Sequence, residues 1–150
     1  MKLTSIHLYT EKRRPPTAAP AAALQRGGGL IGDRHCTDPK KQISITGMDV
    51  LEWVQQHPSA LCARKFSGNL ALDRIMGYPV AVGSVLRIGE GLVRITDTHK
   101  RCFYEDCTLA RSGGPCPLRG GLWFAEALND AKIHAGDTVE ILTQTEETEP

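Results

Sequence analysis

The segment His99-Lys100-Arg101-Cys102 contains the cysteine whose neighbours best suit it to chemistry. Two cations and a histidine precede the thiol, and nearby positive charge favours the thiolate, which is the form that attacks or binds metal. A predicted strand ends just before this segment, and strand ends place side chains on a rigid support at the rim of a sheet. We therefore predict that Cys102 is a reactive thiol. The alternative is a small buried hydrophobe flanked by solvated charges.

Three of the five cysteines fall between positions 102 and 116. These are Cys102, Cys107 and Cys116. Together with His99 they match the donor set of a Cys3His zinc site. Their spacing lacks the Cys-x2-Cys knuckle typical of such sites, so zinc is the weaker alternative for this segment. The two other cysteines are isolated in the sequence, and we predict that both are inert.

A second group of residues indicates anion binding. Basic residues lie in or near glycine-rich loops: Arg26, Arg34, Lys40, Lys41 and Arg119. Arg119 and Gly120 are predicted to open a helix without a capping side chain, and uncapped N–H groups can bind phosphate. The alternative is that these are solvated loop charges. The sequence has no Walker loop and no Gly-x-Gly-x-x-Gly motif, which argues against a nucleotide-driven enzyme.

His35 follows Asp33 and Arg34 in a predicted loop. Histidine changes its charge near neutral pH, so a loop histidine can act as a general base or contact a phosphate. The alternative is a histidine that fixes the loop through a backbone hydrogen bond.

Short strands form most of the framework that must position these residues. Strand patterns cover residues 2–10, 42–45, 69–75 and 138–143. Residues 84–97 are typical of a hairpin, because two apolar strands flank glycines that can adopt positive φ. The proline-rich stretch 15–20 is predicted to be a loop.

Two helices are predicted beside these strands. Thr46 can cap the first, with Asp49 completing a capping-box-like start, and Val50, Trp53 and Val54 share one face. The second is predicted from about position 121, because four apolar residues recur at helical spacing: Phe124, Ala127, Leu128 and Ala131. The sequence therefore predicts a mainly β (α+β) fold, a closed or nearly closed β-barrel with a few short helices packed against it.

Length and charge limit the classes of protein to consider. The 150 residues fit one domain over 1–145, followed by an acidic tail over 146–150 that we predict is disordered. A net charge of +1 argues against nucleic-acid binding. No apolar run is long enough to cross a membrane and the first residues do not look like a signal peptide, so we expect a cytoplasmic protein.

Five pieces of the sequence, in order between about Gly29 and Val139, resemble the MOSC domain. This domain occurs at the C-terminus of molybdenum-cofactor sulfurases and as stand-alone bacterial proteins. The pieces are Gly-Asp-Arg-His at 32–35 with Lys-Gln-Ile-Ser-Ile at 41–45, Phe-Ser-Gly-Asn-Leu at 66–70, the glycine-bounded strand at 82–89, Lys-Arg-Cys at 100–102, and Cys-Pro-Leu-Arg-Gly-Gly-Leu at 116–122.

The resemblance implies a β-barrel with a cleft for the molybdenum cofactor (molybdopterin). It implies that Cys102 carries sulfur as a persulfide or coordinates molybdenum, a role that suits a soft thiolate. The residues that it implies as cofactor contacts are Arg34, His35, Lys41, Asn69, Lys100, Arg119 and Gly120. The implied activity is sulfur transfer or molybdenum-dependent reduction of N-hydroxylated compounds. The alternative is a non-catalytic module that binds a pterin or another anion.

The sequence departs from the family in three ways, one of which is the length of the loop from Cys107 to Pro117. Gly68 stands where the family has a glutamate, so one carboxylate contact is missing. The chain also lacks the aminotransferase-like, pyridoxal phosphate domain of the sulfurases. We therefore expect a separate cysteine desulfurase to supply sulfur, or an electron-donating redox partner to support reduction.

Overall fold

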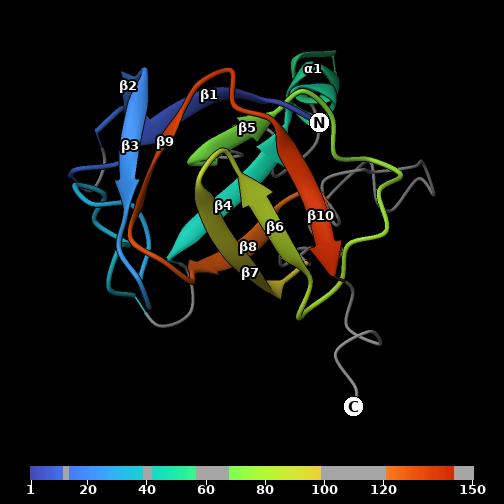
Figure 1. Cartoon of the computed structure of the whole chain (residues 1–150). Helices are drawn as coiled ribbons and strands as arrows, with labels where there is room; N and C mark the ends of the chain where they lie inside the picture. The colour runs from blue at the N-terminus through green and yellow to red at the C-terminus, as the bar shows by residue number, and fades with distance from the viewer. Residues whose placement is uncertain (12–13, 39–41, 57–67, 99–120, 144–150) are drawn as a thin grey trace, which may run out of the picture.

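The structure is a computed structural model of the chain, and it describes residues 1–11, 14–38, 42–56, 68–98 and 121–143. A large mixed sheet dominates these ranges (Figure 1). In spatial order its strands are β10 (Val139–Thr143), β6 (Val85–Ile88), β7 (Gly91–Asp97), β8 (Trp123–Ala127), β4 (Ile43–Gly47), β5 (Leu70–Leu72), β1 (Leu3–Leu8) and β2 (Thr17–Ala19). All neighbours are antiparallel except β4 and β5. A second sheet pairs β3 (Ala21–Leu24) with β9 (Ala131–His134).

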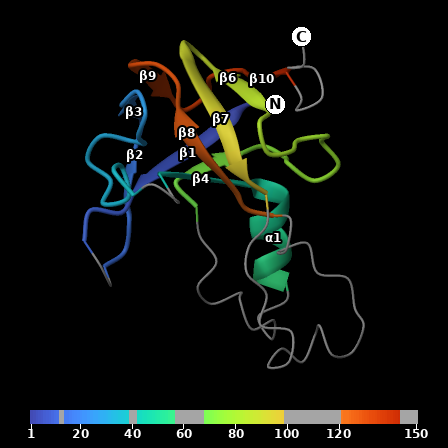
Figure 2. The ribbon, with the colours of Figure 1, turned by 90° about the horizontal axis from the view of Figure 1, so that it is seen from below.

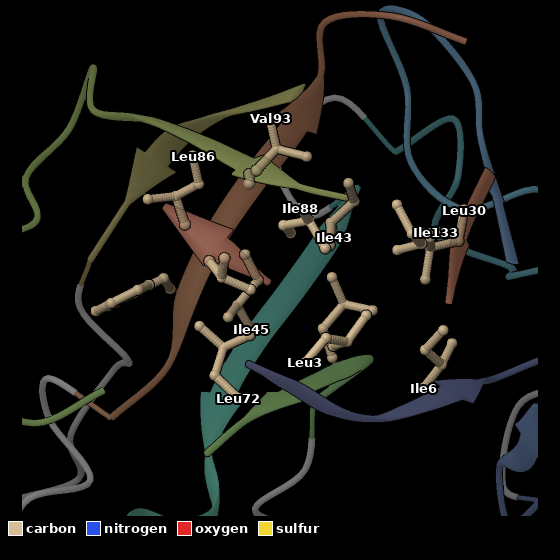
Figure 3. Packing of buried hydrophobic residues seen from close by; sticks show 14 of the residues in the cluster. Leu3, Ile6, Leu30, Ile43, Ile45, Leu72, Leu86, Ile88, Val93 and Ile133 are labelled. Atoms are coloured by element: carbon tan, nitrogen blue, oxygen red, sulfur yellow. The ribbon is translucent and has the colours of Figure 1, made fainter. Parts of the chain in front are cut away.

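The core lies inside the curved sheet and is filled by aliphatic side chains from alternate strand positions. Figure 3 shows Leu3 of β1, Ile43 and Ile45 of β4, and Leu86 of β6 directed into this common interior. All four are fully buried. Alternation puts every second residue of a strand on one face, so each strand can offer an apolar face to the core and a different face outside it.

The sheet is not closed by a continuous ladder, but its two ends approach each other at the N-terminus. Lys2 forms an isolated antiparallel bridge with Thr138, just before β10. The Leu3 N–H donates to Asp137 O at 2.9 Å, and the Val139 N–H donates to Met1 O at 2.8 Å. The predicted β-rich α+β fold is therefore confirmed, with a short seam in place of full closure.

The described helix, α1 (Met48–Gln56), begins directly after β4. Figure 2 shows α1 at one end of the β-structure, away from β2, β3 and β9. Val50 is buried, and Trp53 and Val54 pack against the core, so the predicted apolar face is confirmed. Thr46 is not the helix cap, because it lies within β4 and its hydroxyl donates to Gly121 O at 2.8 Å. The helix α1 is too short to span a bilayer, and no other helix is found in the described ranges.

The prediction of a second helix from about position 121 is wrong. Residues 123–127 form β8, which pairs with β4 and β7, and residues 131–134 form β9. Trp123, Ala125 and Ala127 are buried while Phe124 and Glu126 are less so, which is the alternation of a strand. Pairing with two neighbouring strands satisfies the backbone of β8 on both sides, and this outweighs the helical spacing of its apolar residues.

The remaining strand predictions are confirmed, with one addition. The strands over 2–10, 42–45, 69–75 and 138–143 and the hairpin over 84–97 correspond to β1, β4, β5, β10 and β6–β7. The stretch 15–20, predicted to be a loop, contains the three-residue edge strand β2 between its prolines. The predicted tail over 146–150 lies outside the described residues.

Candidate functional site

Three of the predicted site residues lie in the described part of the chain: Arg34, His35 and Asn69. Five others lie outside it: Lys41, Lys100, Cys102, Arg119 and Gly120. The zinc alternative of His99, Cys102, Cys107 and Cys116 also lies outside it. Among the described residues no group of three or more potential metal ligands is found.

A row of polar side chains lies along one face of β4. Ile43 and Ile45 point into the core, so Ser44 and Thr46 share the opposite face by strand alternation, and Gln42 directly precedes the strand. Gln42 and Thr46 are nevertheless buried, and Ser44 is half-buried. Within the described ranges, Gln42 Oε1 is buried and has no hydrogen-bond partner. This row is the polar face of β4.

Three segments outside the described ranges are followed in the sequence by residues that lie at or against the polar face of β4. Two of these segments carry the remaining predicted site residues. Gln42 follows residues 39–41 directly, and Gly68 follows residues 57–67. A Cβ atom at Gly68 would lie 3.1 Å from Thr46 Cγ2, so the Gly68 backbone runs close against this face. Gly121 follows residues 99–120 and accepts the Thr46 hydroxyl hydrogen bond.

The other border of residues 99–120 is close in the sheet as well. Asp97, at the end of β7, pairs with Phe124 of β8, and Phe124 pairs with Ser44 of β4. In the sequence, the segment that contains Cys102 therefore lies between β7 and β8. In the sheet, β8 is next to β4 and β7 is two places from it.

Asn69 is the centre of a buried hydrogen-bond network on this side of the sheet. It is 2% exposed. Its Nδ2 donates to His7 O at 3.0 Å and to Asp33 Oδ1 at 2.9 Å. Its Oδ1 accepts hydrogen bonds from the N–H and Oγ of Ser44, both at 3.0 Å. A carboxamide has two donor hydrogens and two acceptor lone pairs, so this side chain is fully used within the chain.

Asp33 joins this network to the turn at 33–36. Its side chain has no exposed surface. Besides Asn69, its Oδ1 accepts from the Tyr9 N–H at 2.7 Å, and its Oδ2 accepts from the His35 N–H at 2.9 Å. The resemblance pieces at 32–35 and 66–70 thus meet in space, because Asp33 of the first contacts Asn69 of the second.

His35 and Arg34 are the outward residues of the turn. His35 Nδ1 lies 3.4 Å from Asp33 Oδ2, and the His35 side chain is 29% exposed. Arg34 is exposed, and its backbone N–H donates to Tyr9 O at 2.8 Å, which fixes where the side chain leaves the turn. The turn therefore presents a cation and an imidazole over a buried carboxylate.

Two glycines let this turn lie close to β4. A Cβ atom at Gly28 would be 2.6 Å from Cys36 O, and one at Gly29 would be 2.3 Å from Gln42 O. No other residue type fits these contacts without a shift of the backbone. Cys36 itself is buried, and its Sγ lies 3.7 Å from Gln25 Oε1. That it is inert remains a prediction.

Sequence reasoning overlooked Asp33 and Ser44 as parts of the site. Both are short polar residues inside otherwise ordinary loop and strand patterns, and nothing in the local pattern marks them as buried. The signal that could have found them is their place in the resemblance pieces at 32–35 and 41–45.

A scan of the sequence against protein families finds no match, and a search of curated proteins finds no relative. Solved structures with a similar fold are found. The chain has a YiiM-like fold. YiiM from Escherichia coli matches with a TM-score of 0.60 at 18% identity, over 97% of this chain and 71% of that one. YiiM from Geobacillus stearothermophilus matches with a TM-score of 0.59 at 15% identity, over 95% and 75%.

A third structure is similar over nearly its whole length. The YuaD protein from Bacillus subtilis matches with a TM-score of 0.67 at 15% identity, over 92% of this chain and 93% of that one. YiiM is a MOSC-domain protein, so these matches support a MOSC-like fold. At such identities the likeness concerns the fold alone.

Proposed function

We propose that the protein binds molybdenum cofactor beside the polar face of β4, with Cys102 as the sulfur-bearing or molybdenum-binding thiol. The observation that carries the proposal is the convergence on this face. Gln42, Gly68 and Gly121, which follow residues 39–41, 57–67 and 99–120 in the sequence, all lie at or against this face. The first and last of these segments carry the predicted contacts Lys41, Lys100, Cys102, Arg119 and Gly120. The YiiM-like fold agrees with the fold that the family resemblance implies.

The described residues suit the anionic part of such a cofactor. Arg34 and His35 are consecutive residues of one turn, and the buried network of Asp33 and Asn69 fixes that turn. Arginine and imidazolium both donate hydrogen bonds to phosphate. In the proposal, Arg34 and His35 bind and orient the phosphate, while Asn69 holds the turn against Ser44 of β4. A bound molybdenum centre supplies redox chemistry or accepts sulfur.

The experiment is elemental analysis for molybdenum and zinc on protein expressed in a host that makes the cofactor. We expect molybdenum in the wild type and its loss in Cys102→Ser. Cys36→Ser is the matched control, because this thiol is buried behind the turn, and it should keep the metal. Cyanolysis of the same samples measures persulfide sulfur on Cys102.

Each outcome separates the alternatives. A persulfide without molybdenum would favour sulfur transfer over reduction. Molybdenum absent from wild type and variant alike would overturn cofactor binding. Zinc in the wild type and in Cys36→Ser, but not in Cys102→Ser, would instead indicate a zinc site among the cysteines of residues 99–120.

A further inference from the structure

Gln42, at the start of β4, carries a buried side-chain oxygen that has no partner in the described ranges. The residue is 7% exposed, and its Oε1 is buried and accepts no hydrogen bond there. A carboxamide oxygen can accept two hydrogen bonds, and burying a polar atom without a partner costs free energy. Buried polar atoms are nearly always partnered in folded proteins, so this oxygen points to a group from outside the described chain.

The neighbouring polar side chains of β4 are satisfied, in contrast to Gln42. Ser44 Oγ donates to Asn69 Oδ1 at 3.0 Å and accepts from the Asn69 N–H at 2.8 Å. The Thr46 hydroxyl donates to Gly121 O at 2.8 Å. The unused acceptor is therefore a feature of Gln42 and not a general property of the polar face of β4.

The packing around Gln42 places it beside the turn at 33–36. A Cβ atom at Gly29 would clash with Gln42 O and lie 3.2 Å from Gln42 Cβ, and one at Gly28 would lie 2.6 Å from Cys36 O. Gln42 and the turn therefore flank the same two glycines. The anion contacts of the proposed function belong to that turn, so Gln42 lies next to the residues proposed to bind the phosphate.

The chemistry of Oε1 selects the kind of ligand group that can satisfy it. A neutral carboxamide oxygen only accepts hydrogen bonds, so it suits an N–H or O–H donor and does not suit the oxygens of phosphate or sulfate. Among the residues that the structure describes, no group of three or more potential metal ligands is found, which argues against a cation here. A ring N–H is a rigid donor, and a ligand that lacks it leaves the buried oxygen unpaired.

We propose that Gln42 is a specificity-determining residue whose Oε1 accepts a hydrogen bond from a ring N–H of the bound ligand. The site then selects a nitrogen heterocycle with a free N–H over one whose ring nitrogens are alkylated. Arg34 and His35 bind the anionic end of the ligand, and Gln42 binds its neutral end. The inference rests on the proposed function for the place of the ligand, and it adds what the start of β4 recognises.

The first measurement needs no ligand. In Gln42→Met a thioether side chain of similar length replaces the carboxamide, so the unpaired oxygen is removed and apolar contacts are kept. We expect the midpoint of urea denaturation of the full chain to rise. The matched control is Gln25→Met, because Gln25 is exposed and its Oε1 accepts from Cys36 Sγ at 3.7 Å. The midpoint of this control should not rise.

The second measurement compares two probes by calorimetry. Lumazine is a pteridine with two ring N–H groups, and in dimethyllumazine both of these carry methyl groups. We expect the wild type and Gln25→Met to bind lumazine about tenfold more tightly than dimethyllumazine, the equivalent of one buried hydrogen bond. Gln42→Met should bind lumazine about tenfold more weakly than the wild type and should lose this preference. Its affinity for sulfate, which probes the anion contacts, should equal that of the wild type.

A lower urea midpoint in Gln42→Met would overturn the proposal, because it would show that the chain itself pairs Oε1. The proposal also fails if the wild type does not bind lumazine, or if Gln42→Met keeps the wild-type preference, in which case an ordered water is the partner of Oε1. If Gln42→Met does not fold, the wild type decides the question, since equal affinity for both probes contradicts the proposal.

The outcome is separate from that of the molybdenum measurement. A preference for lumazine that depends on Gln42, in a protein without molybdenum, would support the role of Gln42 and reject the molybdenum centre. Molybdenum in a protein with no such preference would reject the role of Gln42 and leave the proposed function intact.

Discussion

Asn69 lies beside the candidate site and forms its hydrogen bonds within the chain. The resemblance implies that it contacts the cofactor, and this remains a prediction. The structure assigns all four of its hydrogen-bonding positions to His7, Asp33 and Ser44. These partners belong to β1, the turn at 33–36 and β4, so the carboxamide ties together three parts of the chain that are distant in sequence.

Replacing Asn69 by alanine should lower stability strongly. The substitution leaves the buried Asp33 carboxylate, the His7 carbonyl and Ser44 short of partners, and each such loss costs about 1–3 kcal/mol. We expect a loss of roughly 2–4 kcal/mol in the free energy of unfolding, measured by urea denaturation.

The control for this measurement is Asn129→Ala. Asn129 also bonds two backbone groups, Leu92 N–H and Glu90 O, but in a more exposed place. Its loss should cost about 1 kcal/mol or less. Equal losses in the two variants would contradict a special role for the buried network.

Gly68 is the second residue whose identity can be tested, because the resembling family has a glutamate there. A Cβ atom at 68 would lie 3.1 Å from Thr46 Cγ2 and 3.5 Å from Leu122 Cδ1. Thr46 cannot turn away easily, since its hydroxyl is bonded to Gly121 O. We expect Gly68→Glu to lower the unfolding free energy by about 1–3 kcal/mol.

Thr46→Ser tests this cause, because serine keeps the hydroxyl and lacks Cγ2. Combined with Gly68→Glu it should recover part of the lost stability, which a double-mutant cycle measures as a coupling energy. Strictly additive effects would show that the Cγ2 contact is not the cause.

Part of the candidate site could be predicted from sequence and part could not. The loop at 32–35 and the segment at 66–70 were identified together, and the contact between Asp33 and Asn69 brings them together. That Asp33 is buried, and that Asn69 is saturated by its own chain, could not be predicted. Burial depends on which strands become neighbours, and β4 and β5 are parallel partners separated by more than twenty residues.

At the scale of the element, residues 121–134 show why local pattern is not sufficient. Phe124, Ala127, Leu128 and Ala131 recur at helical spacing, and alanine favours helices. The same stretch also alternates, with Trp123, Ala125 and Ala127 buried. β8 lies between β4 and β7, so its conformation is decided by long-range pairing. The hairpin over 84–97 was predictable because its two strands pair with each other across a glycine turn.

The start of α1 gives a prediction at this scale. Asp49 accepts hydrogen bonds from the Val50 N–H at 2.9 Å, the Ile75 N–H at 3.3 Å and the Met76 N–H at 3.0 Å. It therefore joins the helix to the loop after β5. We expect Asp49→Ala to cost about 1–3 kcal/mol of unfolding free energy, because three backbone donors lose their acceptor.

Glu52→Ala is the matched control on the same helix, since Glu52 is exposed. It should change the unfolding free energy by no more than about 0.5 kcal/mol. Both variants are measured by urea denaturation. An Asp49→Ala protein as stable as Glu52→Ala would contradict the proposed link between the helix and the loop.

At the scale of the whole molecule, the seam between the ends of the sheet depends on the first residues of the chain. The Lys2 N–H donates to Asp73 Oδ1 at 3.0 Å, and the Asp73 N–H donates to Lys2 O at 2.9 Å. The hydrogen bond from Lys2 lowers the pKa of Asp73 below its ordinary value, against the smaller opposing effect of burial. The ionised carboxylate thus helps to hold the seam.

This lowered pKa predicts how stability changes in acid. The unfolded chain binds a proton at Asp73 more readily than the folded chain, so the contribution of Asp73 is complete above about pH 4 and is lost as the pH falls through the folded pKa. Asp73→Asn should remove this part of the acid dependence, as measured by urea denaturation at a series of pH values. The same pH dependence in both proteins would contradict the role of Asp73. The effect should be small, because the carboxylate is largely exposed.

The seam also has a consequence for how the chain folds during its synthesis. The bridge partner of Lys2, Thr138, is made 136 residues after it (138 − 2). At about 5–20 residues per second, this delay is roughly 7 to 27 s. The ladder partners of β1, β2 at 17–19 and β5 at 70–72, are made during that time, whereas Thr138 and β10 at 139–143 are made only afterwards. The two ends of the sheet can therefore meet only after Thr138 has been made, and conditions that stall the ribosome before position 138 should leave an aggregation-prone nascent chain with the edge of β6 unpaired.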